Sequence, residues 1–222
     1  MHLSHVGACT GRDHFSGWSL DWVNLAIGYL PYLRRFYAPA DARAAFIAVR
    51  DAASAYGGHI VAIPRDNLPV LNRQGSTEPL WYATDDWTAV TPFRKFSGAS
   101  TAILSLGAPS YLAGKAAERA ASGGVPTDVC IINGLPIPPT FWTELASRYR
   151  RILTIEDGLI GTLNSGLRGF AAHVVGQLYG SGLKLKHFGI SDPRIAPSEH
   201  FGEVWKHFQM TEEALAAALQ NE

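Results

Sequence analysis

Apolar residues recur along this chain in two spacings, one typical of strands and one typical of helices. Short runs rich in β-branched residues predict buried strands. The strands are expected at residues 2–6, 34–38, 59–63, 101–105, 128–132, 152–155 and 184–190. Apolar positions three and four residues apart predict the helices between them. The helices are expected at residues 20–30, 41–56, 110–122, 141–148, 167–178, 199–207 and 212–219.

Several of these helices carry recognisable start and stop signals. Ser19 is expected to cap the helix that begins at Leu20, and Pro31 to end it. Asp41 stands at the positive amino-terminal end of the next helix, which Gly57 should stop. The alternation of strands and helices predicts an α/β fold, with a parallel-type sheet and helices on both of its faces.

Residues 151–180 form the most informative unit. The apolar run 152–155 predicts a strand that stops at Glu156-Asp157-Gly158. Carboxylates are rarely buried, so Glu156 and Asp157 are expected to face a crevice or solvent at the end of this strand. A glycine-rich loop follows, with Asn164 or Ser165 as the expected N-cap of a helix and Gly180 as its stop. Ligands of α/β proteins often meet the chain at such strand ends, although a purely structural turn would read the same way.

The pattern divides the chain into three parts. Residues 1–71 supply about three strands and two helices, which is little core for an independent domain. Residues 72–97 are polar and aromatic with little periodicity, and they read as a linker with one or two short strands. Residues 98–222 repeat strand and helix regularly and are expected to form a complete domain.

Composition narrows the function classes. Among 222 residues, 19 Lys and Arg balance 19 Asp and Glu, so nothing in the net charge favours nucleic acid or a membrane surface. No apolar run approaches the ~20 residues of a membrane-spanning helix. The amino terminus lacks the pattern of a signal peptide, and the two cysteines are far apart in sequence. Two reduced thiols and no leader predict a cytoplasmic protein. No metal-binding motif is present.

The order of several short motifs resembles a known family. Pro39-Ala40-Asp41 precedes a helix, and Ile63-Pro64-Arg65-Asp66-Asn67-Leu68-Pro69-Val70-Leu71 follows a strand. Farther on come Thr154-Ile155-Glu156-Asp157 and Phe188-Gly189-Ile190-Ser191-Asp192. Together these resemble the carboxyl-terminal part of the transketolase superfamily of thiamine diphosphate enzymes. The resemblance implies a partial pyrimidine-binding domain at 1–71. It also implies a carboxyl-terminal domain at 98–222 with a mostly parallel five-stranded sheet, whose usual role is dimer contact.

The resemblance also implies roles for individual residues. His5 and Asp13 match a loop in which a histidine contacts sugar phosphate and an aspartate contacts a substrate hydroxyl. Arg65 matches a phosphate-contacting arginine, a role that suits a planar bidentate donor. An ordinary loop histidine, a turn-capping aspartate and a surface arginine are the structural alternatives. Gly17 stands where the family has a histidine close to the cofactor, and nearby His14 is the candidate catalytic replacement.

The family's diphosphate-binding domain, with its magnesium motif, has no counterpart in this sequence, and neither has the first half of the pyrimidine domain. Thiamine diphosphate and Mg²⁺ are therefore expected to be bound mainly by a partner chain. The expected function is the carboxyl-terminal subunit of a split transketolase-like enzyme that transfers a two-carbon ketol or acyl unit. Its partners would be a larger amino-terminal subunit and a second copy of itself across a two-fold axis. A noncatalytic dimerisation or scaffold module, and a piece of a longer transketolase-like polypeptide, are the alternatives.

Overall fold

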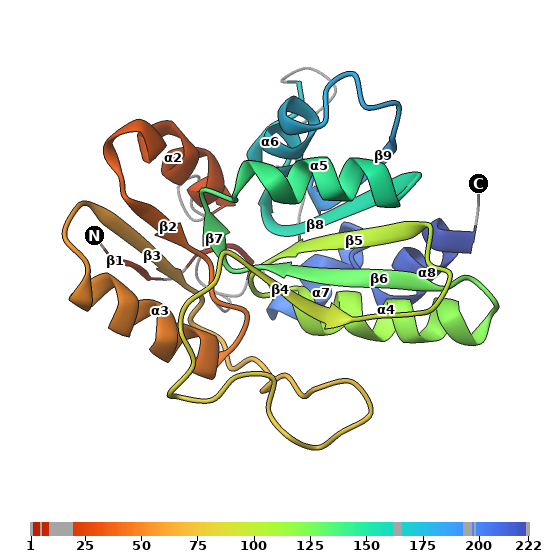
Figure 1. Cartoon of the computed structure of the whole chain (residues 1–222), viewed down its shortest axis with the longest axis horizontal. Helices are drawn as coiled ribbons and strands as arrows, with labels where there is room; N and C mark the ends of the chain where they lie inside the picture. Colours follow the sequence, from red (N-terminus) through yellow and green to blue (C-terminus); the bar gives the residue numbers. More distant parts are fainter. Residues whose placement is uncertain are drawn as a thin grey trace.

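The computed structural model describes residues 2–4, 6–8, 20–161, 166–192, 197 and 199–220, and for residues 2–4 it describes the backbone only. The described residues form two sheets that lie end to end, with helices packed around them (Figure 1). One sheet is built mainly from the first 70 residues and the other from residues 90–190.

The first sheet has the strand order β1-β3-β2-β7. Its strands are β1 (His2–Ser4), β2 (Arg35–Tyr37), β3 (His59–Ile63) and β7 (Gly134–Leu135). The first three are parallel, and β7 pairs antiparallel with β2. Helix α3 (Ala42–Ser54) joins β2 to β3, and α2 (Trp22–Tyr29) with the short 3₁₀ turn η1 (Leu30–Tyr32) precedes β2. The strands predicted around 34–38 and 59–63 are therefore confirmed.

The second sheet has five strands in the order β4-β6-β5-β8-β9. They are β4 (Val90–Arg94), β5 (Thr101–Leu106), β6 (Thr127–Ile132), β8 (Arg151–Leu159) and β9 (Lys184–Ile190). Only β4 is antiparallel to its neighbour. The mostly parallel five-stranded sheet implied by the resemblance is therefore confirmed. β4 begins inside the segment that reads as a linker, and it continues the sheet of the second half.

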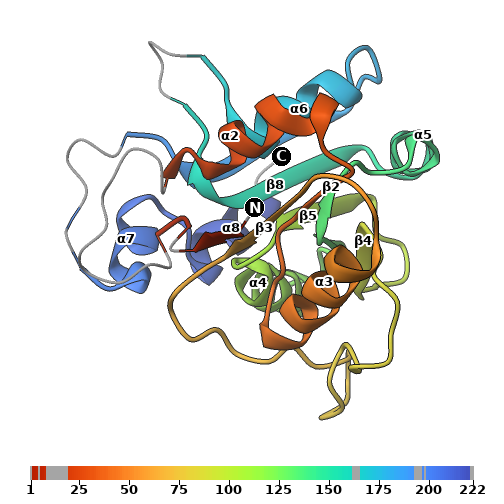
Figure 2. The ribbon, with the colours of Figure 1, turned by 90° about the vertical axis from the view of Figure 1, so that its left-hand side faces the viewer.

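Helices cover both faces of this second sheet (Figure 1). Helices α4 (Ser110–Ser122), α7 (Phe201–His207) and α8 (Glu212–Gln220) lie on one face, and α5 (Pro139–Arg148) and α6 (Gly169–Gln177) lie on the other. Figure 2 shows α2 beside α6, so a helix from the first half also helps to cover the second sheet.

The two halves share one core. β7 follows β6 directly in the chain yet pairs with β2, and Ala38 N–H donates to the Asn133 carbonyl at 2.8 Å. A Cβ on Gly134 would lie 2.1 Å from the Phe36 carbonyl oxygen, so only glycine permits this close approach. Apolar residues of both halves pack into common clusters. The first half therefore gains part of the core that its own few elements cannot supply.

Large apolar residues of the first half differ in how far they are covered. Leu20 and Val23 are buried against the second half. Leu25 and Phe46 keep 40% and 55% of their surface exposed. In the described part of the chain, β1 also pairs on one side only and so forms an edge of the first sheet. These exposed groups are the ones a further chain could cover.

Three local predictions differ from the structure. Asp21 occupies the cap position of α2, and Ser19 lies outside the described residues. Arg168 occupies the cap position of α6, while Asn164 and Ser165 also lie outside them. The helices predicted to run to the glycines at 57 and 180 end earlier, at Ser54 and Gln177. Asp41 does cap α3, as its place before the helix predicts.

The largest correction concerns Glu156 and Asp157. The strand does not stop before them, because β8 continues to Leu159 and both side chains are buried, at 0% and 2% exposure. Between the pairs Ile155–Phe188 and Leu159–Ile190, β8 has three residues where β9 has only Gly189. This bulge carries the two carboxylates into the interior, where hydrogen-bond donors from distant segments meet them.

Candidate functional site

The carboxyl ends of the parallel strands of the first sheet lie together. Ser4, at the end of β1, pairs with Ile63, at the end of β3, and Tyr37 at the end of β2 pairs with Val61. After Ile63 the chain passes over the amino-terminal end of α3. A cavity of about 220 Å³ lies between this segment and the helix, and we call it the β3 crevice. It is lined by Pro39, Asp41, Ala42, Ala45, Ile63, Pro64, Arg65, Asp66, Asn67 and Leu68.

Asp41 shapes this crevice. The side chain is only 4% exposed, and its Oδ1 accepts hydrogen bonds from the backbone N–H groups of Arg43 at 2.9 Å and Ala44 at 2.8 Å. Its Oδ2 accepts from Leu71 N–H at 2.9 Å. One carboxylate therefore satisfies the free amides of α3 and also fixes the far end of the 64–70 segment against that helix.

Arg65 projects from this fixed segment at the crevice. Its side chain is exposed, and it is the only cation that lines the crevice in the described part of the chain. Neighbouring Asp66 also lines it, and its Oδ2 is buried with no hydrogen-bond partner among the described residues. An exposed guanidinium at a strand end can bind an anion such as phosphate.

The other candidate residues, His5, Asp13 and His14, lie outside the described residues, as does Gly17. The described residues on either side of the 9–19 segment nevertheless meet at one place. Ala8 N–H donates to Asp157 Oδ1 at 2.9 Å, and Trp22 Nε1–H donates to the Asp157 carbonyl at 2.8 Å. Ala8 and Trp22, which flank the part of the sequence with Asp13 and His14, therefore both contact Asp157.

Asp157 also connects the helix α7 to this junction. Its Oδ1 accepts a second hydrogen bond, at 2.7 Å, from Trp205 Nε1–H. A small cavity of about 10 Å³ beside it is lined by Val6, Ala38 and Pro64 among others, so the junction lies next to the β3 crevice. A Cβ on Gly7 would lie 2.3 Å from Asp157 Oδ2, and the positive φ of +68° at Gly7 also favours glycine.

Glu156 points to the opposite face of the sheet. Its Oε2 and Oε1 accept hydrogen bonds from the N–H groups of Phe170 at 3.0 Å and Ala171 at 2.8 Å, in the first turn of α6. Burial raises the pKa of Glu156 to about 8, although both amide donors act to lower it. Glu156 and Asp157, which were expected to face a crevice, therefore have structural partners. They hold neighbouring segments in place by hydrogen bonds.

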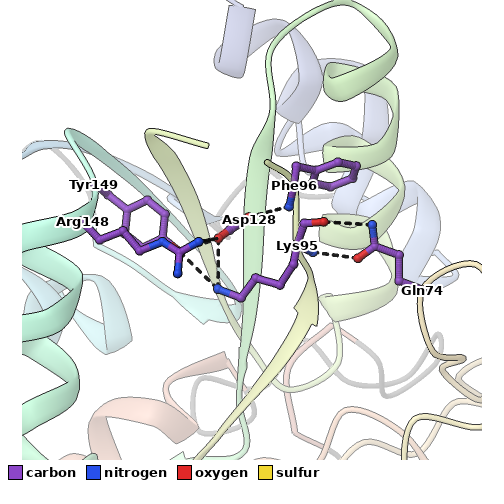
Figure 3. A network of polar contacts seen from close by, with 6 residues as sticks. All are labelled: Gln74, Lys95, Phe96, Asp128, Arg148 and Tyr149. Carbon is purple, nitrogen blue, oxygen red and sulfur yellow. Dashed lines mark hydrogen bonds and ion pairs between the residues drawn. The ribbon is translucent and has the colours of Figure 1, made fainter. Parts of the chain in front are cut away.

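A fourth buried carboxylate, Asp128, was not singled out from the sequence. Figure 3 shows Lys95, Phe96, Arg148 and Tyr149 converging on it. Its Oδ2 accepts from Lys95 Nζ at 3.0 Å, Arg148 Nη2 at 3.0 Å and Tyr149 OH at 2.7 Å, and its Oδ1 accepts from Phe96 N–H at 2.8 Å. Burial raises the pKa of Asp128, but these donors outweigh it and lower the pKa overall. The sequence signal was a lone Asp at the start of an apolar strand.

Comparisons with known proteins place the fold. No protein-family model and no curated protein matches this sequence. A split-gene transketolase, described as an inactive β4 tetramer, has a TM-score of 0.74 at 19% identity, covering 99% of this chain and 64% of that chain. Transketolase from Campylobacter jejuni has a TM-score of 0.68 at 16% identity, covering 100% of this chain and 31% of that chain. The fold is that of the carboxyl-terminal part of transketolases.

A third transketolase, from Pichia stipitis in complex with sedoheptulose 7-phosphate, agrees with these two. Its TM-score is 0.64 at 20% identity, and the match covers 98% of this chain and 29% of that chain. The chain thus spans under two thirds of the split-gene transketolase and less than a third of the other two. At these identities the transketolase likeness confirms the fold, and the roles of single residues remain predictions.

In the part of the chain that the structure describes, no helix is long and apolar enough to cross a membrane. Within the same residues, no three His, Cys, Asp or Glu side chains gather in a way that could hold a metal ion. Arg65 is the only sequence-predicted site residue that the structure places, and it lies at the β3 crevice.

Proposed function

We propose that this chain is the carboxyl-terminal subunit of a split transketolase-like enzyme that depends on thiamine diphosphate. The assembled enzyme transfers a two-carbon ketol or acyl unit, and it is active only with a partner chain that carries the diphosphate and Mg²⁺ site. The observation that carries this proposal is the match to a split-gene transketolase over 99% of the chain. The exposed Leu25 and Phe46 and the edge strand β1 support a partner that covers the first half.

In the proposed enzyme the partner chain supplies most of the thiamine diphosphate site. The β3 crevice, at about 220 Å³, is smaller than typical cofactor pockets of roughly 300–1,000 Å³. Hard divalent ions need several converging oxygen ligands, and the described residues present no such group. In the proposed enzyme this chain binds and orients the phosphorylated end of the substrate, with Arg65 as the anchor and His5 and Asp13 as the further substrate-binding residues that the resemblance implies.

The cofactor proposal predicts a difference between the free chain and the assembly. The purified chain alone should show no magnesium-dependent binding of thiamine diphosphate in a calorimetric titration at micromolar concentrations. The complex isolated from the native host through a tag on this chain should bind the cofactor and transfer a ketol unit. Micromolar binding by the free chain would overturn the assignment. A cofactor-free complex, or a chain that purifies without a partner, would instead favour the scaffold function.

Substitution of Arg65 tests the substrate role. In the assembled enzyme, Arg65→Ala should raise the KM for a phosphorylated substrate roughly 10–100-fold, because a charge-assisted contact with a phosphate contributes about 1.5–3 kcal/mol. The rate constant kcat and the unfolding midpoint should change little, since Arg65 is exposed. Arg65→Lys keeps the charge but not the bidentate geometry, so its KM should lie between those of wild type and Arg65→Ala.

Arg34→Ala is the matched control. Arg34 is equally exposed, but it precedes β2 at the opposite end of the same sheet and donates to the Tyr56 carbonyl at 3.2 Å. Arg34→Ala should therefore leave both kcat and KM unchanged. A KM that is unchanged by Arg65→Ala, or that rises equally in both variants, would exclude Arg65 from substrate binding.

A further inference from the structure

A second cavity lies at the far end of the molecule from the β3 crevice. Its volume is about 660 Å³, and it opens where β5, β8 and β9 begin, beside the end of α8. The amino-terminal ends of these strands face away from the first half, as Figure 1 shows. We call it the basic cavity. It is lined by Ser100, Thr101, Val125, Ala146, Tyr149, Arg150, Arg151, Ser181, Gly182, Leu183, Lys184, Leu219 and Gln220.

The charge of this lining is one-sided. It includes the cations Arg150, Arg151 and Lys184, and none of the described residues that line it is acidic. The chain as a whole has equal numbers of acidic and basic side chains. Three cations in the lining of one cavity are therefore a local concentration of positive charge.

Backbone pairing holds the three cations together. Arg151 and Lys184 are register partners on neighbouring parallel strands, and Lys184 N–H donates to the Arg150 carbonyl at 3.1 Å. Neighbouring strands lie only about 4.8 Å apart. Like charges side by side on a sheet repel one another, so a bound anion between them would be stabilised and would remove this cost.

Of the three cations, only Arg151 has a structural role among the described residues. Arg151 donates to the carbonyl groups of Ala218 and Leu219 and so caps the carboxyl end of α8. Among the described residues, the side chains of Arg150 and Lys184 make no hydrogen bond or ion pair. Both are exposed at the mouth of the cavity. Two cations are thus available to a ligand.

The remaining walls indicate what the anion would carry. Ser100, Thr101 and Ser181 bring hydroxyl groups, which can donate to phosphate oxygens. Val125, Leu183 and Leu219 bring apolar surface on which an organic group can rest. The volume falls within the range of roughly 300–1,000 Å³ that small-molecule sites occupy.

We propose that the basic cavity is a binding site for a small organic phosphate of nucleotide size, separate from the β3 crevice. Arg150 and Lys184 bind the phosphate groups, and the apolar wall holds the organic part. Guanidinium groups match phosphate oxygens in geometry as well as in charge. The proposal does not depend on the proposed catalytic function, because it uses none of the residues of the β3 crevice.

Calorimetric titration of the full chain with ADP and with pyrophosphate, both without magnesium, tests the proposal. Both probes carry a diphosphate group, so the difference between their affinities measures the contribution of the apolar wall. ADP should bind once per chain, with a dissociation constant below about 1 mM and more tightly than pyrophosphate. Added salt should weaken binding of both. Replacing Arg150 and Lys184 together with Gln should weaken ADP binding at least about tenfold.

Three control variants locate the binding. Lys115→Gln with Lys186→Gln removes the same charge from exposed positions on α4 and β9 and should leave the affinity within about twofold. Arg65→Ala should also leave it unchanged, which separates this site from the β3 crevice. Ser181→Asp places a carboxylate at the mouth and should abolish binding without touching the strands, which covers the case in which the double Gln variant fails to fold.

The proposal is overturned by several results. These are no saturable ADP binding at millimolar concentration, equal losses in the two double variants, and ADP binding no tighter than pyrophosphate. Binding that appears only when residues 221–222 are removed would also overturn it.

Discussion

Asp157→Ala is expected to lower the free energy of unfolding by roughly 3–5 kcal/mol, the largest loss we predict for a single substitution outside the apolar core. Asp157 is 2% exposed and accepts hydrogen bonds from Ala8 N–H and Trp205 Nε1–H. Alanine would leave both buried donors without an acceptor, and each unsatisfied donor costs about 1–3 kcal/mol. Chemical denaturation of the chain in its native assembly measures the loss.

Asp157→Asn separates the hydrogen bonds from the charge. The amide oxygen can still accept from both donors, so the loss should be less than half of that for alanine. Glu144→Ala is the control, because Glu144 is an exposed carboxylate on α5 and its removal should change stability by less than about 0.5 kcal/mol. Equal unfolding midpoints for wild type and Asp157→Ala would show that these bonds contribute nothing net.

A double-substitution cycle assigns the effect to a specific bond. Trp205→Phe removes the indole donor and keeps most of the ring. Combined with Asp157→Ala, which removes the acceptor, it should show a coupling energy of roughly 1–2 kcal/mol. Asp157 also holds Ala8 and Trp22, which flank the segment with Asp13 and His14. Alanine would release Ala8, so we expect Asp157→Ala to reduce enzyme activity by more than its loss of stability alone would.

Hydrophobic periodicity was sufficient to predict most elements, because each depends on residues close in sequence. The helix Ser110–Ser122 and the strand Lys184–Ile190 have the predicted bounds. Asp41 was also predictable, since an aspartate before a helix has a local role as its cap. Arg65 was found from a motif, and the structure places it at a strand end.

The errors arose where partners are distant in sequence. Glu156 and Asp157 were expected to face a crevice or solvent because an unpaired carboxylate is costly to bury. Their donors include Ala8, 149 residues from Asp157, and Trp205, 48 residues from it. No local pattern reveals such pairs. The placement of β7 in the first sheet was missed for the same reason, because two residues carry no periodicity.

The second large effect is on the dependence of stability on pH, and it comes from Glu156. Burial raises its pKa from an ordinary 4.5 to about 8 in the folded chain. The folded state therefore holds a proton on Glu156 between pH 4.5 and 8, where the unfolded state has lost it. Its contribution to stability is complete below pH 4.5 and is lost as the pH rises to 8. The loss should be on the order of 5 kcal/mol.

Glu156→Gln removes this titration while nearly keeping the shape of the side chain. The amide oxygen can accept from Ala171 N–H, but the amide nitrogen would face the Phe170 donor. At pH 5 the variant should therefore be about 1 kcal/mol less stable than wild type. At pH 9 it should be more stable, because wild type then buries a charge between the sheet and α6. The two stability curves should cross between these values.

Denaturation of both proteins from pH 5 to 9 provides the measurement, and the difference between the curves isolates Glu156 from other groups. Burial lowers the pKa values of His173 and His187, but these two groups contribute equally to both proteins. Parallel curves would mean that Phe170 and Ala171 N–H stabilise the ionised carboxylate as well as water does. Crossing curves would show instead that the carboxyl group of Glu156 is protonated at neutral pH. It would then be an uncharged hydrogen-bond acceptor, buried where the sheet meets α6.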